Sequence, residues 1–185
     1  MSDTLETRSN VSDLAPLDDL TVEGYAVVFS QPSVFSGLAS WDYEIIEPGA
    51  FVNCDMSNVV FRYNHSDADQ LLARTSNNTL VLTIDDKGLH VKASLADTQQ
   101  GRDLYKLIER RDVSAMSFSF VVGESYIEHR VRHVTAIKRL ADVSAVDNPA
   151  YPATTIDVVQ RSVDKLVADD KATRARIQIL ANTIA

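Results

Sequence analysis

The segment from Val113 to Val122 alternates in a way that constrains the fold more than any other stretch. Read as a strand, it has large apolar side chains on one face and small side chains, including two serines, on the other. The large residues are Met116, Phe118, Phe120 and Val122, and the small ones are Ala115, Ser117 and Ser119. The plain interpretation is a core strand whose second face packs against a neighbour. The alternative is that the small face leaves room for a molecule that must approach closely.

The rest of the chain predicts further short strands, one internal helix and one terminal helix. Strands are expected at residues 20–29, 41–46, 59–65, 71–75, 78–85, 89–95, 125–134 and 135–146, and helices at 102–110 and 156–184. Turn-forming residues separate these elements, as at Asp85–Gly88. This succession is typical of a mostly-β barrel or sandwich with peripheral helices.

With 185 residues, the chain is long enough for one domain with appendages. Residues 1–19 are rich in Ser, Asp and Thr without periodicity, which predicts a flexible arm. Residues 20–157 then form the β domain, and residues 158–185 form a helical segment.

Charge and composition exclude several classes of partner. The formal net charge is −8, so nucleic acid is not expected as a partner. No apolar run approaches the roughly 18 residues of a membrane helix, and the polar, acidic N-terminus does not resemble a signal peptide. The single cysteine, Cys54, lies beside Asp55 and is not expected to be a nucleophile.

Among the four histidines, His65 has the best position for chemistry. It ends a predicted strand and precedes a polar loop, and reactive groups are often displayed at such strand ends. His90 lies mid-strand beside Lys92, which indicates a solvated face. His129 and His133 lie about 13 Å apart along an extended strand, too far to share one metal ion, so neither a metal nor another cofactor is predicted.

Six short motifs stand in an order and spacing that resemble the prohead proteases of HK97-type tailed bacteriophages over residues 20–157. They are Gly24–Phe29, Glu47–Phe51, the strand ending in His65, Leu80–Leu82 continuing through Gly88–Val91, Met116–Phe120, and Asp142–Val146 leading to Pro149–Pro152. The resemblance implies a seven-stranded, partly closed β-barrel with peripheral helices, of the herpesvirus assembly protease type. It also implies a serine endopeptidase.

The resemblance places the nucleophile on Ser117, the base on His65 and the orienting acid on Asp142. Relatives often have Glu at the last position, so Asp is a conservative departure. The residues agree, because Ser117 belongs to the small face, which a substrate backbone is expected to reach. Asp142 follows Ser117 by 25 residues, as expected for two neighbouring strands joined by a hairpin.

Several alternatives stay open from the residues alone. Ser119 has the same parity as Ser117 and Ser114 is close by, so the pattern does not choose among these serines. Asp147 is a second candidate for orienting the histidine, whereas Asp67 and Asp69 are expected in a solvated loop. The backbone N–H groups of the Asp147–Tyr151 turn are our candidates for oxyanion donors.

The expected substrates are the scaffold protein or the scaffold-like arm of the major capsid protein, cut inside the prohead in the host cytoplasm, and the protease itself. A substrate is expected to add as a strand along an exposed sheet edge. The terminal helix is a candidate for self-association into a homo-oligomer or for capsid contacts. The alternative function is a catalytically inactive capsid-assembly scaffold module of the same fold.

Overall fold

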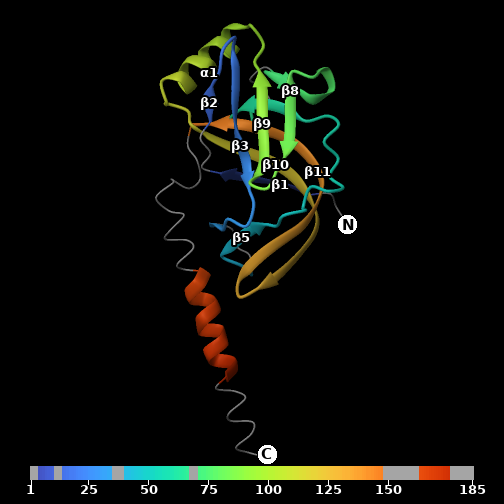
Figure 1. The fold of residues 1–185 in the computed structure, drawn as a ribbon, viewed down its shortest axis with the longest axis vertical. Coiled ribbons are helices and arrows are strands. Elements are labelled where there is room, and N and C mark those ends of the chain that lie inside the picture. Colours follow the sequence, from blue (N-terminus) through green and yellow to red (C-terminus); the bar gives the residue numbers. More distant parts are fainter. Residues whose placement is uncertain (1–3, 11–13, 35–39, 67–70, 148–162, 176–185) are drawn as a thin grey trace, which may run out of the picture.

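The computed structural model describes residues 4–10, 14–34, 40–66, 71–147 and 163–175. Within this part the chain is mostly β, with two helices (Figure 1). The strands are β1 Leu5–Asn10, β2 Ala15–Pro16, β3 Thr21–Val28, β4 Ser33–Val34, β5 Tyr43–Ile46, β6 Val60–Tyr63, β7 Ala73–Arg74, β8 Leu80–Ile84, β9 Gly88–Ser94, β10 Ala115–Glu128 and β11 Val131–Val146. The helices are α1 Gln99–Glu109 and residues 163–175, and Thr75–Asn77 forms a single 3-10 turn, η1.

The strands form two sheets. The seven-stranded sheet has the order β1-β10-β11-β5-β4, with β6 paired to β11 and β7 paired to β6. The four-stranded sheet has the order β2-β3-β9-β8. The mostly-β class is confirmed, but the seven-stranded barrel is not, because neither sheet closes on itself within the described strands. Periodicity identifies the residues that face the core, but it does not tell whether two sheet edges pair.

The hydrophobic core includes side chains from both sheets. The apolar face of β10 contributes Met116, Phe118 and Phe120, all at most 2% exposed. From the smaller sheet, Val22 of β3 and Leu89 of β9 join the same cluster. The alternation predicted for β10 is therefore confirmed. Its first seven residues, 115–121, are buried on both faces.

The long hairpin of β10 and β11 turns at a place that the sequence pattern did not indicate. His129 and Arg130 have φ values of 51° and 62°, and the last strand pair before them is Glu128 with Val131. Two central residues with positive φ are typical of a tight hairpin turn. The single strand predicted over residues 125–134 is therefore wrong, since the turn divides it. The residue pattern shows no sign of this turn, because neither turn residue is the glycine or asparagine that usually marks one.

The predicted flexible arm is wrong for residues 5–10. They form β1, which pairs antiparallel with β10 from Leu5–Val121 to Asn10–Met116. Backbone pairing and ion pairs hold this strand, and none of its residues belongs to the hydrophobic core cluster. Such a strand has no alternation of apolar residues from which it could be predicted. Ala15–Pro16 of the same segment forms β2.

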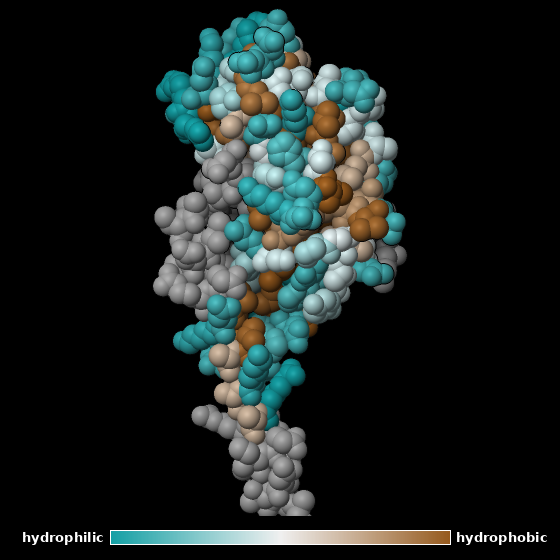
Figure 2. Space-filling model, in the orientation of Figure 1, coloured by the Kyte–Doolittle hydropathy of each residue, from teal (hydrophilic) through white to brown (hydrophobic). Residues whose placement is uncertain are grey.

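Helix α1 begins three residues before its predicted start. Thr98 is its N-cap and accepts a hydrogen bond from the backbone N–H of Gly101 at 3.2 Å. Leu104 and Ile108 are buried, and Figure 2 shows hydrophilic residues on the outer side of this end of the molecule. The helix therefore covers one end of the core with a narrow apolar stripe.

The terminal helix is described over residues 163–175, and the rest of the predicted span lies outside the described residues. Near the hairpin turn, Nε2 of His129 lies 2.9 Å from Oδ2 of Asp170. Neither helix in the described part of the chain is long and apolar enough to cross a membrane.

Candidate active site

His65 lies just past the end of β6, in a turn fastened to the end of β11. β6 pairs in parallel with β11, from Val60–Asp142 to Tyr63–Ala145. Asn64 and His65 both have positive φ, 51° and 55°, which is uncommon for residues other than glycine.

Two side chains, one at the end of β6 and one in the turn that follows, bind the same carboxylate. The Tyr63 hydroxyl and the Asn64 amide each donate to Oδ2 of Asp147 at 3.0 Å. The backbone N–H of Asp147 donates in return to Oδ1 of Asn64 at 3.2 Å. These bonds hold the backbone of His65 beside the last residues of β11.

The small face of β10 meets a polar stretch of β11. Ser117 is paired with Ser144 across the two strands, and Ser119 with Asp142. Directly opposite residues of an antiparallel pair have neighbouring side chains on the same face. These four side chains are therefore close to one another, and each residue is at most 8% exposed.

The imidazole of His65 lies between two of these groups. Its Nε2 is 2.5 Å from Oγ of Ser117, and its Nδ1 is 2.6 Å from Oδ1 of Asp142. Ser119 lies on the other side of the ring, 3.3 Å from Nδ1. The structure thus brings together the three side chains named from the sequence, and it distinguishes Ser117 from Ser119 by the ring nitrogen that each one faces.

Serine hydroxyls support the carboxylate of Asp142. Ser144 donates to its Oδ1 at 2.9 Å and lies 3.2 Å from Nδ1 of His65. Burial alone would raise the pKa of Asp142, but the hydrogen bond and charge of His65, with hydrogen bonds from Ser119 and Ser144, lower it from its ordinary value. This environment therefore favours an ionised carboxylate, which accepts a hydrogen bond from the Nδ1–H of the imidazole.

The expectation that a substrate can reach Ser117 directly is wrong for this state of the molecule. Ser117 is 0% exposed. Its Oγ lies 2.7 Å from the carbonyl oxygen of Arg8, and the hydroxyl of Ser9 donates to it at 3.3 Å. β1 therefore lies against the serine on the side opposite β11.

The other candidates from the sequence lie away from this constellation or outside the described residues. Ser114 is exposed and precedes β10. Burial raises the pKa of Cys54 to about 11, which agrees with an unreactive thiol. Asp67, Asp69, and the turn with its proposed oxyanion donors beyond Asp147 lie outside the described residues. Among the described residues, no group of three or more His, Cys, Asp or Glu side chains could hold a metal ion.

Two features of the site were not identified from the sequence. The supporting role of Ser144 could have been predicted from the sequence, since Ser144 follows Asp142 by two residues and lies on the same face of the strand. The approach of β1 had no comparable signal, because it depends on the pairing of strands more than a hundred residues apart.

The chain was compared with protein families, curated proteins and solved structures. The family model described as "Caudovirus prohead serine protease" matches residues 4–171. No match was found among curated proteins or solved structures.

Proposed function

The chain belongs to the caudovirus prohead serine protease family, and from this we propose that it is a serine endopeptidase whose nucleophile, base and orienting acid are Ser117, His65 and Asp142. The observation that carries the assignment is the position of the His65 ring, with Ser117 at one nitrogen and Asp142 at the other. A serine hydroxyl becomes a good nucleophile only when a base accepts its proton, and this arrangement supplies that base.

In the first step, Oγ of Ser117 attacks the carbonyl carbon of the scissile peptide bond, and Nε2 of His65 accepts the hydroxyl proton. Asp142 accepts a hydrogen bond from Nδ1 and stabilises the imidazolium. The tetrahedral intermediate collapses when the C–N bond breaks. His65 returns the proton to the leaving amine, so the products are a free amine and an ester of Ser117.

In the second step, water attacks the ester, and His65 accepts a proton from that water. The new carboxylic acid leaves and Ser117 regains its proton. Neither of these two reaction steps requires a metal or an organic cofactor. The hydrogen bonds that Asp142 accepts from Ser119 and Ser144 hold its carboxylate in place through both steps.

The family assignment supports a role in phage capsid maturation, inside the prohead in the host cytoplasm. We propose that the substrates are the scaffold protein or the scaffold-like arm of the major capsid protein, and that the protease also cuts itself. We further propose that this is an HK97-type member with a herpesvirus assembly protease-like fold.

The test is co-expression of the chain with the capsid protein of the same phage. Wild type is compared with Ser117→Ala, His65→Ala and Asp142→Asn by gel and mass spectrometry. Cleavage should be lost in the first two variants, and reduced about ten-thousandfold in the third, because an asparagine partner favours the wrong imidazole tautomer.

Ser114→Ala is the matched control, because Ser114 is exposed and lies three residues before the proposed nucleophile. This variant should cleave like wild type. Equal cleavage by wild type and Ser117→Ala would disprove the assignment. An intact capsid protein with every form, including wild type, would instead support the inactive scaffold module.

A further inference from the structure

The backbone of β1 approaches the proposed nucleophile as a peptide substrate would. β1 is an extended segment paired antiparallel with β10, and Ser9 is the cross-strand partner of Ser117. The carbonyl oxygen of Arg8, the residue before, lies 2.7 Å from Oγ of Ser117. A peptide carbonyl therefore already occupies the space next to this hydroxyl.

This carbonyl competes with the base for one proton. Ser117 has a single hydroxyl hydrogen, and two acceptors are within hydrogen-bond distance: Nε2 of His65 at 2.5 Å and the oxygen of Arg8 at 2.7 Å. When the hydroxyl donates to Arg8, it does not donate to His65. The same strand helps to leave Ser117 with no exposed surface. Another peptide carbonyl can therefore reach this hydroxyl only if β1 moves away from it.

β1 is attached by polar contacts. None of its residues belongs to the hydrophobic core cluster, and its one large apolar side chain, Leu5, is 51% exposed. The core begins with Leu14, whose backbone N–H donates to the carbonyl of Ser114 at 3.2 Å. Detachment of residues 5–10 therefore removes no side chain from the core cluster, and the chain stays anchored at Leu14.

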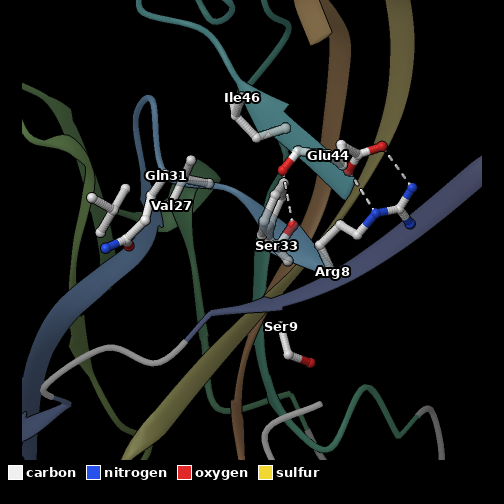
Figure 3. A pocket seen from close by; sticks show the side chains of 9 residues that line it. Arg8, Ser9, Val27, Gln31, Ser33, Glu44 and Ile46 are labelled. Carbon is white, nitrogen blue, oxygen red and sulfur yellow. Dashed lines mark hydrogen bonds and ion pairs between the residues drawn. The ribbon is translucent and has the colours of Figure 1, made fainter. Parts of the chain in front are cut away.

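A four-residue charge cluster, Glu6, Arg8, Glu44 and Arg132, holds β1 in register. Arg8 binds Glu44 of β5 through two hydrogen bonds, at 2.6 and 2.9 Å, as Figure 3 shows. Glu6 binds Arg132 of β11 at 2.7 and 3.1 Å. Glu44 and Arg132 also bind each other at 3.1 Å. If β1 leaves, one acid and one base leave together, and the buried Glu44 keeps a charged partner.

We propose that β1 occupies the strand position of the substrate, and that an extended peptide pairs antiparallel with β10 in its place, with its scissile carbonyl where the carbonyl of Arg8 now lies. This inference rests on the proposed protease function and names the binding mode of the same site. Pairing at a sheet edge supplies main-chain hydrogen bonds for any sequence, and side-chain contacts supply the selectivity.

When β1 leaves, Glu44 and Arg132 of the charge cluster remain. Their charges define which peptide can bind in its place. Glu44 faces the residue at the position of Arg8, and Arg132 faces the residue two positions earlier. In a strand, residues two positions apart lie on the same face. The complementary substrate is therefore an extended peptide with a basic residue before the scissile bond and an acidic residue two positions before that.

A reversible disulfide lock tests whether β1 must leave. Leu5 and Val121 are cross-strand partners, so Leu5→Cys/Val121→Cys in the full chain can bridge β1 to β10. The readout is the rate at which a fluorophosphonate probe labels Ser117, measured by intact mass. The oxidised variant should label at least about tenfold more slowly than the same protein after reduction. The two variants that carry only one of these substitutions, beside the native Cys54, should not respond to reductant.

A second variant weakens the attachment and allows a peptide to compete. Glu6→Gln/Arg8→Gln should label faster than wild type by up to about tenfold, because two charge-assisted contacts are lost. A synthetic peptide of residues 4–10 should then slow the labelling of this variant. A control peptide with the glutamate and arginine exchanged should compete at least about tenfold less well.

The outcomes separate this inference from the proposed function. If wild type labels at Ser117 but neither the lock nor the weakened attachment changes the rate, β1 is a fixed structural strand and the inference is wrong. Equal competition by both peptides overturns the predicted charge pattern. If no form labels, including the weakened variant and the reduced lock variant, the serine is not activated and the proposed function itself fails.

Discussion

Nε2 of His65 lies 2.5 Å from Oγ of Ser117, although His65 follows β6 and Ser117 belongs to β10, two strands that do not pair with each other. β11 lies between them, with β10 on one edge and β6 on the other. The contact therefore depends on the turn that follows β6, which brings the imidazole back over β11. Changes in that turn should affect the proposed chemistry as strongly as changes in β10.

The first prediction concerns Asp147, whose carboxylate accepts hydrogen bonds from Tyr63 and Asn64. Asp147→Ala removes the single oxygen that accepts both bonds, and it loosens the turn that holds His65. We expect labelling of Ser117 by a fluorophosphonate to slow about tenfold, because small misplacements of a catalytic group are costly. The matched control is Asp85→Ala, since Asp85 accepts from Tyr25 and from two turn N–H groups in the other, four-stranded sheet. Loss of labelling in the control alone would contradict this role.

The second prediction concerns Ser144, which donates to Oδ1 of Asp142. This bond helps to lower the pKa of Asp142, so in Ser144→Ala that pKa rises toward its ordinary value. If activity needs the ionised carboxylate, the acid side of the kcat/KM profile should move to higher pH by less than about one unit. Peptide hydrolysis across pH 3 to 9 measures the shift. Ser114→Ala should keep the wild-type profile, and an unshifted Ser144→Ala profile would show that this bond does not matter.

The sequence predicts much of the site because its chemistry is local. Met116–Phe120 alternates, so Ser117 and Ser119 must share a face, and Asp142 follows at hairpin distance. The choice between the two serines depended on the family resemblance, since parity treats them alike. Geometry distinguishes them, because Ser117 faces Nε2 of His65 and Ser119 faces Nδ1.

The features that the sequence did not predict are those held by backbone pairing and by charges. β1 has no apolar periodicity, so its place beside β10 depends on ladder hydrogen bonds and on the Arg8–Glu44 ion pair. The turn at His129 and Arg130 lacks the usual turn residues. The division of the strands into two sheets depends on edge contacts, which the inward-facing residues do not specify.

The third prediction concerns the acid stability that Asp142 provides. Its pKa is lowered in the folded protein, so its ionised form stabilises the fold above its ordinary pKa of about 3.9, and this contribution is lost as pH falls through the lowered value. Asp142→Asn should therefore be less stable than wild type by about 1–3 kcal/mol at pH 7. The difference should shrink below about pH 4. Urea unfolding at a series of pH values tests this, and a constant difference from pH 7 to pH 2 would argue against it.

The fourth prediction concerns Glu44, which is 1% exposed and accepts hydrogen bonds from both Arg8 and Arg132. Glu44→Gln leaves two guanidinium groups with the single carboxylate of Glu6 in a largely buried place. We expect a loss of about 3–5 kcal/mol in the free energy of unfolding, because an uncompensated buried charge is costly. Asp42→Asn is the matched control, since Asp42 also makes a two-bond pair, with Arg130, but at an exposed position. The control should show no measurable change, because water already solvates both partners. Urea unfolding at neutral pH measures both variants. If the two lose similar amounts of unfolding free energy, burial of the charge cluster does not determine how much the cluster stabilises the fold.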